Sequence, residues 1–187
     1  MRILYVLLIG LVITLSSCHV HKDVIAKQDR EKQHYIHKHG SPTKYSTEEY
    51  IATYKRIARL QMRKYGIPAS IILAQGILES NSGNSDLSRY AKNHFGIKCT
   101  KDWEGRTYYK DDDKPNECFR RYHDAKDSFR DHSEFLKRPR YARLYELKRK
   151  DYKSWAKELK KAGYATDPNY TQRLINLIEK YDLEKYD

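Results

Sequence analysis

The chain carries the almost wholly apolar stretch Ile71-Ile72-Leu73-Ala74-Gln75-Gly76-Ile77-Leu78-Glu79, and a small polar segment follows at once, Ser80-Asn81-Ser82-Gly83-Asn84-Ser85. Pro68 favours a helix start just before this stretch, and a helix that is apolar on nearly all sides is predicted to be the buried central helix. Glu79 then lies at its end, where desolvation and the negative end of the helix dipole disfavour the ionised carboxylate. Glu79 is therefore the candidate general acid; the alternative is a surface Glu that caps the helix or pairs with a nearby cation.

Helical periodicity recurs on both sides of the central stretch. Ser46-Thr47-Glu48-Glu49 is a capping box, and the helix that it begins is predicted to end at Gly66. Further helices are predicted from near Ser85, over residues 125–136, over residues 152–162, and from a cap at Asp167 with Pro168 in the first turn.

Residues 98–122 show a different pattern. The acidic turn Asp111-Asp112-Asp113-Lys114-Pro115-Asn116 lies between Thr107-Tyr108-Tyr109 and Cys118-Phe119-Arg120, which predicts a small β-hairpin. The expected fold class is mainly α (α+β), with a helical body and a small hairpin lobe that form a cleft.

The N-terminus has the features of an export signal. Arg2 precedes a short apolar run through Leu15, too short for a spanning helix, and Leu15-Ser16-Ser17-Cys18 resembles a bacterial lipobox. The resemblance implies cleavage before Cys18 and a lipid on its sulfur, and thus a protein anchored in the cell envelope, facing the periplasm or the exterior. An uncleaved anchor and a plain secretory signal are the alternatives. The predicted organisation is a lipoprotein signal peptide at 1–17, a flexible tether at 18–46 and a catalytic domain at 47–187.

Two further sequence features bear on metals and disulfides. The tether contains several histidines, but their irregular spacing favours a solvated linker over a metal-binding tract, so no metal is expected. If Cys18 is lipidated, Cys99 and Cys118 are left in an oxidising compartment, which predicts a disulfide between them. Such a bond would close a loop of about 20 residues and contribute roughly 3 kcal/mol through loop entropy.

The chain is strongly basic, with a formal net charge of +12. A basic protein outside the cytoplasm is attracted to anionic envelope polymers and to the carboxylates of peptidoglycan peptides. Nucleic acid is the alternative partner for such a charge. Cations alternate with acids along the predicted helices, as in Lys157-Glu158-Leu159-Lys160-Lys161, which is typical of a solvated helical face. Together with the export signal, this pattern argues against nucleic acid.

Ordered motifs downstream of Glu79 resemble those of a known family. They are Ser82-Gly83-Asn84-Ser85-Asp86-Leu87-Ser88, Asn93-His94-Phe95-Gly96-Ile97-Lys98, Trp103-Glu104-Gly105, Phe119-Arg120-Arg121-Tyr122 and Gly163-Tyr164-Ala165-Thr166-Asp167. From about Tyr50 to the C-terminus the chain resembles the N-acetylglucosaminidase family of peptidoglycan hydrolases, glycoside hydrolase family 73. The resemblance implies a lysozyme-like fold, in which Glu79 is the essential acid.

The resemblance also implies a second carboxylate on the hairpin lobe, unless the substrate's N-acetyl group takes its place. The candidates are Asp111, Asp112, Asp113 and Glu117, and Asp111 or Asp112 is favoured. Each of them has a solvated acidic turn as the alternative interpretation.

Sugar binding is assigned to residues that match the family's motifs. Aromatic side chains offer flat apolar faces to pyranose rings, and Tyr164 and Tyr170 are the candidates on that ground. Asn93 and Phe95 resemble the family's Asn-x-Phe-Gly segment, which lines the cleft floor. A turn amide and a core ring are the structural alternatives for these two residues.

The implied activity is cleavage of the β-1,4 bond between N-acetylglucosamine and N-acetylmuramic acid, as an endo-β-N-acetylglucosaminidase. The implied partner is the peptidoglycan glycan strand, and the expected enzyme is a monomer without a cofactor or metal. The alternatives are a lytic transglycosylase, whose usual motif is absent, and a non-catalytic peptidoglycan-binding lipoprotein.

Overall fold

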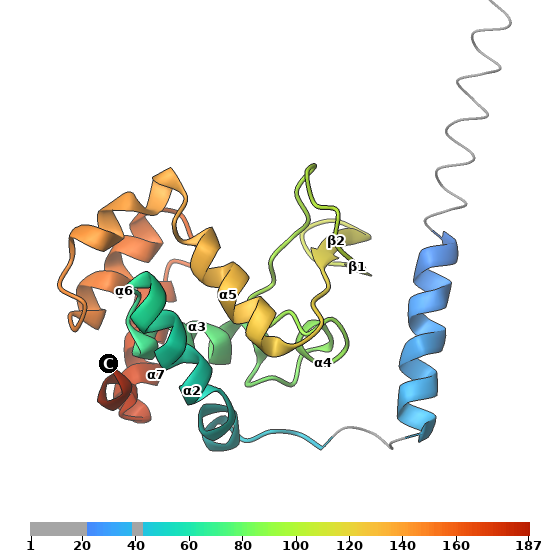
Figure 1. The fold of residues 1–187 in the computed structure, drawn as a ribbon, viewed down its shortest axis with the longest axis horizontal. Coiled ribbons are helices and arrows are strands. Elements are labelled where there is room, and N and C mark those ends of the chain that lie inside the picture. Colours follow the sequence, from blue (N-terminus) through green and yellow to red (C-terminus); the bar gives the residue numbers. More distant parts are fainter. Residues whose placement is uncertain (1–21, 39–42) are drawn as a thin grey trace, which may run out of the picture. The chain divides into compact units, whose positions relative to one another are not determined.

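The structure, a computed structural model, describes residues 22–38 and 43–187, which fall into two units, residues 1–43 and residues 44–187 (Figure 1). The predicted signal peptide at 1–17 and the lipidation site Cys18 lie outside the described residues. Within residues 22–38 and 43–187, no helix is both long enough and apolar enough to cross a membrane.

Residues 22–38 form one helix, where the composition predicted a flexible tether. All of its side chains are exposed or half-buried. The local sequence accounts for the helix, because it is rich in strong helix formers and places opposite charges four residues apart, as at Asp23, Lys27 and Glu31. That this segment tethers the domain stays a prediction.

The second unit begins with helix α2 (Thr47–Tyr65), whose two ends match the sequence prediction. Ser46 and Glu49 form the reciprocal capping box, and Gly66 ends the helix in the left-handed conformation at φ 79°. Buried residues of α2 pack against α3 (Ala69–Ser80). The contact is close at Gly76, where a Cβ atom would come within 2.6 Å of the Tyr50 hydroxyl.

Helix α3 is the buried central helix that the apolar stretch predicted. Every residue from Ala69 to Ile77 is buried, and only at Leu78 and Glu79 does the helix reach solvent. Asn81 ends the helix at positive φ, and Ser82 and Gly83 continue in that conformation. The Ser80 hydroxyl accepts a hydrogen bond from the Gly83 amide at 2.7 Å, which fixes this tight turn directly beside Glu79.

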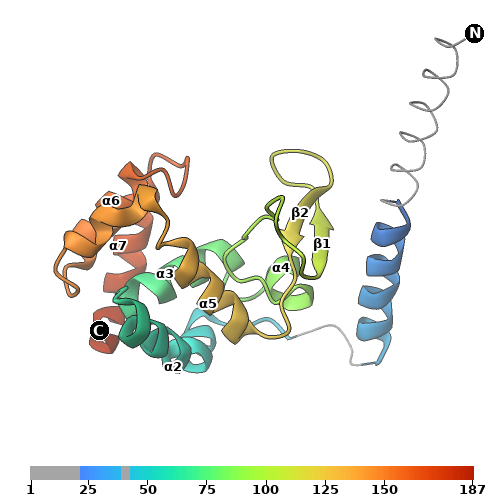
Figure 2. The same ribbon diagram turned by 45° about the horizontal axis from the view of Figure 1, so that its top comes forward.

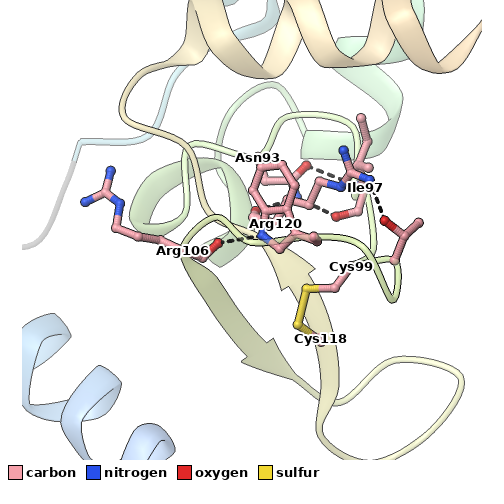
Figure 3. The surroundings of a disulfide bond; sticks show 8 residues. Asn93, Ile97, Cys99, Arg106, Cys118 and Arg120 are labelled. Atoms are coloured by element: carbon pink, nitrogen blue, oxygen red, sulfur yellow. Dashed lines mark hydrogen bonds between the residues drawn. A yellow bond between two sulfur atoms is a disulfide. The ribbon is translucent and has the colours of Figure 1, made fainter.

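The predicted hairpin is present as strands β1 (Thr107–Lys110) and β2 (Glu117–Arg120), paired antiparallel with Thr107 opposite Arg120. Cys99 and Cys118 are disulfide-bonded, as predicted, which links β2 to the segment that precedes the hairpin (Figure 3). We call residues 97–122 the hairpin lobe. The short helix α4 (Asp86–Tyr90), with Ser85 as its cap, packs beneath the lobe through Leu87.

The remaining elements complete the helical body. They are α5 (Ala125–Phe135), the 3-10 helix η1 (Pro139–Glu146), α6 (Tyr152–Lys161), α7 (Tyr170–Lys180) and η2 (Leu183–Tyr186). Within the second unit, Figures 1 and 2 both show α5 lying between the hairpin on one side and α6 and α7 on the other.

Helix α7 begins later than predicted. Its cap is Asn169 rather than Asp167, because the Asp167 carboxylate accepts a hydrogen bond from the Asn169 amide at 2.8 Å and pairs with Arg173 at 2.8 Å. The segment from Gly163 to Asn169 therefore stays a loop, and this loop borders the site described next.

Candidate active site

A cleft of about 660 Å³ lies between the helical body and the hairpin lobe. The end of α3, the segment 95–100, the hairpin, the end of α5, the loop 164–167 and the start of α7 all contribute to its walls. Of the residues predicted for the site, Glu79, Phe95, Asp112, Tyr164 and Tyr170 line this cleft. Asp111 and Asn93 are not among the lining residues.

Glu79 is placed by the C-terminal end of α3, so its carboxyl faces the cleft while the helix behind it is buried. The side chain is accessible to solvent from the cleft, but the protein around it displaces enough water to raise the pKa of the Glu79 carboxyl above its usual value. A hydrogen bond from Tyr170 and the positive charge of Arg173 partly oppose this rise. The result is a carboxylic acid that keeps its proton to a higher pH than a solvated Glu.

Tyr170 orients that acid. Its hydroxyl donates to Glu79 Oε1 at 3.1 Å and accepts from Gln75 Nε2 at 3.0 Å, so the hydroxyl is held between two side chains of α3. The ring is 2% exposed and stacks on Tyr164, with centroids 5.6 Å apart and planes 28° apart. Tyr170 therefore acts on the position and pKa of Glu79 and offers a sugar little surface, whereas Tyr164 is more accessible.

Asn93 has a structural role where the sequence predicted sugar binding. It is 1% exposed, its side-chain amide donates to the carbonyls of Ile97 and Arg120 at 3.0 and 2.9 Å, and its Oδ1 accepts from the Ile97 amide (Figure 3). These bonds join the segment before the disulfide to β2, and they leave Asn93 without a free face toward the cleft. The turn amide, which the sequence left open as an alternative, describes it better.

Phe95 lies at the cleft but is also a core residue. Its ring is 5% exposed and stacks on His132 at 3.9 Å with the planes 14° apart. His132 is fully buried, and burial lowers its pKa to about 3, so the stacked imidazole is neutral. Sequence reasoning missed His132; its place in the helical pattern of 125–136 indicated core, but nothing indicated that it supports Phe95.

The acidic turn of the hairpin is organised by one lysine. Lys98 Nζ lies 3.0 Å from Asp112, 2.9 Å from Asp113 and 2.8 Å from Glu117. Partial burial works to lower the pKa of Lys98, but the three carboxylates outweigh it and raise the pKa. The carboxylates of these three acids lie within 4.8 Å of one another, a spacing that a cation can bridge, and the Lys98 ammonium is the cation that they hold.

Asp111 and Asp112 occupy different environments although they are neighbours. Asp111 Oδ1 accepts a hydrogen bond from the Asn116 amide at 2.8 Å and so closes the turn. Asp112 lines the cleft, on the opposite side from Glu79. Of the two favoured candidates, only Asp112 is therefore placed to face a substrate; Asp113 also lines the cleft, and Glu117 does not.

Comparison with known proteins agrees with this geometry. Residues 55–183 match the model of the glucosaminidase family, described as mannosyl-glycoprotein endo-beta-N-acetylglucosaminidase. Exo-glucosaminidase LytG of Bacillus subtilis is 34% identical over 142 residues, which are 70% of this chain and 50% of LytG. Peptidoglycan hydrolase FlgJ of Vibrio parahaemolyticus is 30% identical over 155 residues, 76% of this chain and 50% of FlgJ. The chain thus spans about half the length of these curated relatives.

Solved structures show the same fold. The glycoside hydrolase domain of Salmonella typhimurium FlgJ superposes with a TM-score of 0.64 at 31% identity, over 75% of this chain and 91% of that domain. The catalytic domain of the autolysin Auto from Listeria monocytogenes gives a TM-score of 0.64 at 28% identity, over 86% of this chain and 97% of that domain. The helical body, the hairpin lobe and the family match together show that this chain belongs to the glucosaminidase family of glycoside hydrolases, glycoside hydrolase family 73.

Proposed function

We propose that this chain is a peptidoglycan hydrolase that cleaves the β-1,4 bond between N-acetylglucosamine and N-acetylmuramic acid, as an endo-β-N-acetylglucosaminidase. The observation that carries the proposal is Glu79, an acid of raised pKa at the end of a buried helix, hydrogen-bonded to Tyr170 in a cleft that the family fold forms. The relatives named as a glucosaminidase and as a peptidoglycan hydrolase support the choice of bond and polymer.

In the proposed mechanism Glu79 gives its proton to the oxygen of the scissile bond. The bond from that oxygen to C1 of N-acetylglucosamine breaks, and the sugar passes through an oxocarbenium-like transition state. Asp112, across the cleft, acts as the second carboxylate, as nucleophile or as the base that takes a proton from water. The half-buried ring of Tyr164, which lines the cleft, offers its remaining apolar surface to a pyranose, while Tyr170 holds the acid in place.

The site of action follows from the polymer. A peptidoglycan hydrolase works in the cell envelope, and we propose a lipid at Cys18 as the anchor that holds this one there, facing the periplasm or the exterior as a monomer. The lipobox-like Leu15-Ser16-Ser17-Cys18 supports the anchor. Labelling cells with a tagged fatty acid tests it, since the wild-type chain should carry the label and Cys18→Ala should not.

Digestion of purified peptidoglycan by the full chain in detergent micelles tests the activity. The reduced products are identified by mass spectrometry for wild type, Glu79→Gln and Glu146→Gln, an exposed glutamate outside the cleft. Wild type and Glu146→Gln should release fragments with reducing-end N-acetylglucosamine, and Glu79→Gln should be slower by about a thousandfold, the scale of a lost general acid.

Other outcomes would replace the proposal. Anhydro-muramic ends would make the protein a lytic transglycosylase. Tight binding of peptidoglycan without cleavage by wild type would make it a wall-binding lipoprotein.

A further inference from the structure

Three aromatic side chains form one continuous wall of the cleft, which we call the aromatic wall: Phe135, Tyr164 and Tyr170. Phe135 meets Tyr164 edge to face with centroids 6.2 Å apart, and Tyr164 stacks on Tyr170 at 5.6 Å. At one end of the wall, Tyr170 donates its hydrogen bond to Glu79. All three line the cleft, so the aromatic wall extends from Glu79 along the cleft.

Arg138 stands at the other end of the aromatic wall. Its guanidinium lies over the Phe135 ring, 4.4 Å from the centroid, and the residue lines the cleft. The backbone around it is fixed, because its amide donates to the Phe135 carbonyl at 3.3 Å, its carbonyl accepts from the Tyr141 amide at 2.9 Å, and Pro139 follows. The backbone contacts fix where the Arg138 side chain begins, and the Phe135 ring supports its guanidinium through a cation–π contact.

Among the described residues, no carboxylate forms an ion pair with Arg138. Among the described residues that line the cleft, Lys98 is surrounded by three carboxylates and Arg173 pairs with Asp167 at 2.8 Å. Arg138 has no carboxylate oxygen of the described residues within 4.0 Å, although its charge is one of several that lower the pKa of the exposed Asp102. Lys110 also lacks such a partner, but it lies on the hairpin rather than on the wall that leads to Glu79.

We propose that Arg138 binds a carboxylate of the glycan strand and so makes the enzyme prefer anionic strands to neutral ones. This inference rests on the proposed function. Each N-acetylmuramic acid carries a lactyl group that ends either in a free carboxylate or in an amide bond to a peptide with carboxylates of its own, whereas N-acetylglucosamine carries no carboxylate. A planar guanidinium with free N–H donors matches a carboxylate in charge and in geometry.

The test compares strands that differ only in their carboxylates. The full chain digests three substrates. They are peptidoglycan with its peptides, stripped strands from which the peptides have been removed, and methylamide strands, in which the lactyl carboxylates of stripped strands have been coupled to methylamine. The variants are Arg138→Gln, Arg138→Lys and Arg149→Gln, the last being an exposed arginine outside the cleft that has no ion pair among the described residues. The readout is kcat and KM, from the reducing ends formed.

Arg138→Gln should lower kcat/KM about tenfold, mainly through KM, on strands with carboxylates and leave the methylamide strands unchanged. Arg138→Lys should recover part of the loss, and Arg149→Gln should match wild type. A loss confined to peptide-bearing strands would identify a peptide carboxylate as the bound group, and a loss confined to stripped strands would identify the lactyl carboxylate. A loss on both would mean that Arg138 binds whichever of the two carboxylates the strand carries.

If Arg138→Gln loses as much kcat/KM on methylamide strands as on strands with carboxylates, the proposal is overturned. It is also overturned if Lys110→Gln shows the same carboxylate-dependent loss, because the effect would then come from the net charge of the cleft. If wild type cleaves none of the strands, the proposed function fails separately. Co-sedimentation of the same variants with stripped and methylamide strands then still tests whether Arg138 binds a carboxylate.

Discussion

The helical body and the hairpin lobe place acidic side chains on opposite sides of one cleft, in opposite kinds of surroundings. Glu79 ends a buried helix, and the protein around it raises the pKa of its carboxyl. Asp112 belongs to an exposed turn, and its carboxylate lies 3.0 Å from the Lys98 ammonium. The surroundings of the two acids differ because the elements that carry them differ: a buried helix carries Glu79, and an exposed turn carries Asp112.

The helical body also contains two buried histidines, and their protonation should cause a large loss of stability in acid. Burial lowers the pKa of His94 to about 4, with the charge of Lys92 adding to the effect, and burial lowers the pKa of His132 to about 3. Because the folded state binds these protons less readily than the unfolded chain, their contribution to stability is complete above pH 6.5 and is lost as the pH falls through about 4 and 3. At pH 4, each histidine should therefore lower the free energy of unfolding by on the order of 3 kcal/mol relative to its value above pH 6.5.

Thermal unfolding at pH 7 and pH 4.5 measures this loss. His132→Phe keeps an aromatic ring against Phe95 and has no proton to gain, so the drop in Tm between the two pH values should be smaller than in wild type. His123→Asn is the matched control, because His123 is exposed on the protein surface, and its Tm should drop as in wild type. If His132→Phe loses as much Tm as wild type, acid acts elsewhere, for example on the ion pairs of the hairpin lobe.

The two neighbouring acids of the hairpin should differ in their contribution to kcat. Asp112→Asn should lower kcat about a hundredfold, because Asp112 faces the cleft as the proposed second carboxylate. Asp111→Asn should change kcat little, since Asp111 accepts the Asn116 amide and an Asn side-chain oxygen can accept it too. Steady-state kinetics on peptidoglycan compares them. Full activity in Asp112→Asn would mean that the hairpin lobe supplies no catalytic carboxylate at this position. It would point to the substrate's N-acetyl group as the nucleophile.

The body was predictable from the sequence because its signals are local. The capping box at Ser46, the helix start near Ser85 and the glycine stop at Gly66 each depend on residues close together in the sequence, and all are present in the structure. The apolar run of α3 likewise predicted both a buried helix and an acid at its exposed end. One local signal failed, because Asp167 bonds the Asn169 amide and Arg173 instead of capping the helix.

The lobe was predictable only in outline, because its arrangement depends on contacts between distant residues. Lys98 meets its three carboxylates 14 to 19 positions along the chain, and nothing in the acidic turn itself tells Asp111 from Asp112. Asn93 bonds the carbonyl of Arg120, 27 residues away, so its motif was recognisable while its role was not. The Cys99–Cys118 disulfide was an exception, since two cysteines in an oxidising compartment leave one pairing.

Removing the Tyr170 hydroxyl should change the pKa of Glu79 only slightly. The Tyr170 hydroxyl stabilises the ionised carboxylate, so its hydrogen bond lowers the pKa of Glu79 against the larger rise caused by burial. Tyr170→Phe removes that bond and should raise the pKa further. Since Glu79 acts in its protonated form, activity is lost as the pH rises through its pKa, and the basic limb of the kcat/KM profile should therefore move to higher pH by less than about one unit.

Tyr181→Phe, at the end of the same helix and outside the cleft, should keep the wild-type profile. A basic limb that moves to lower pH would mean that the tyrosine supports the protonated acid instead, and the raised pKa of Glu79 would then depend on Tyr170 as much as on burial.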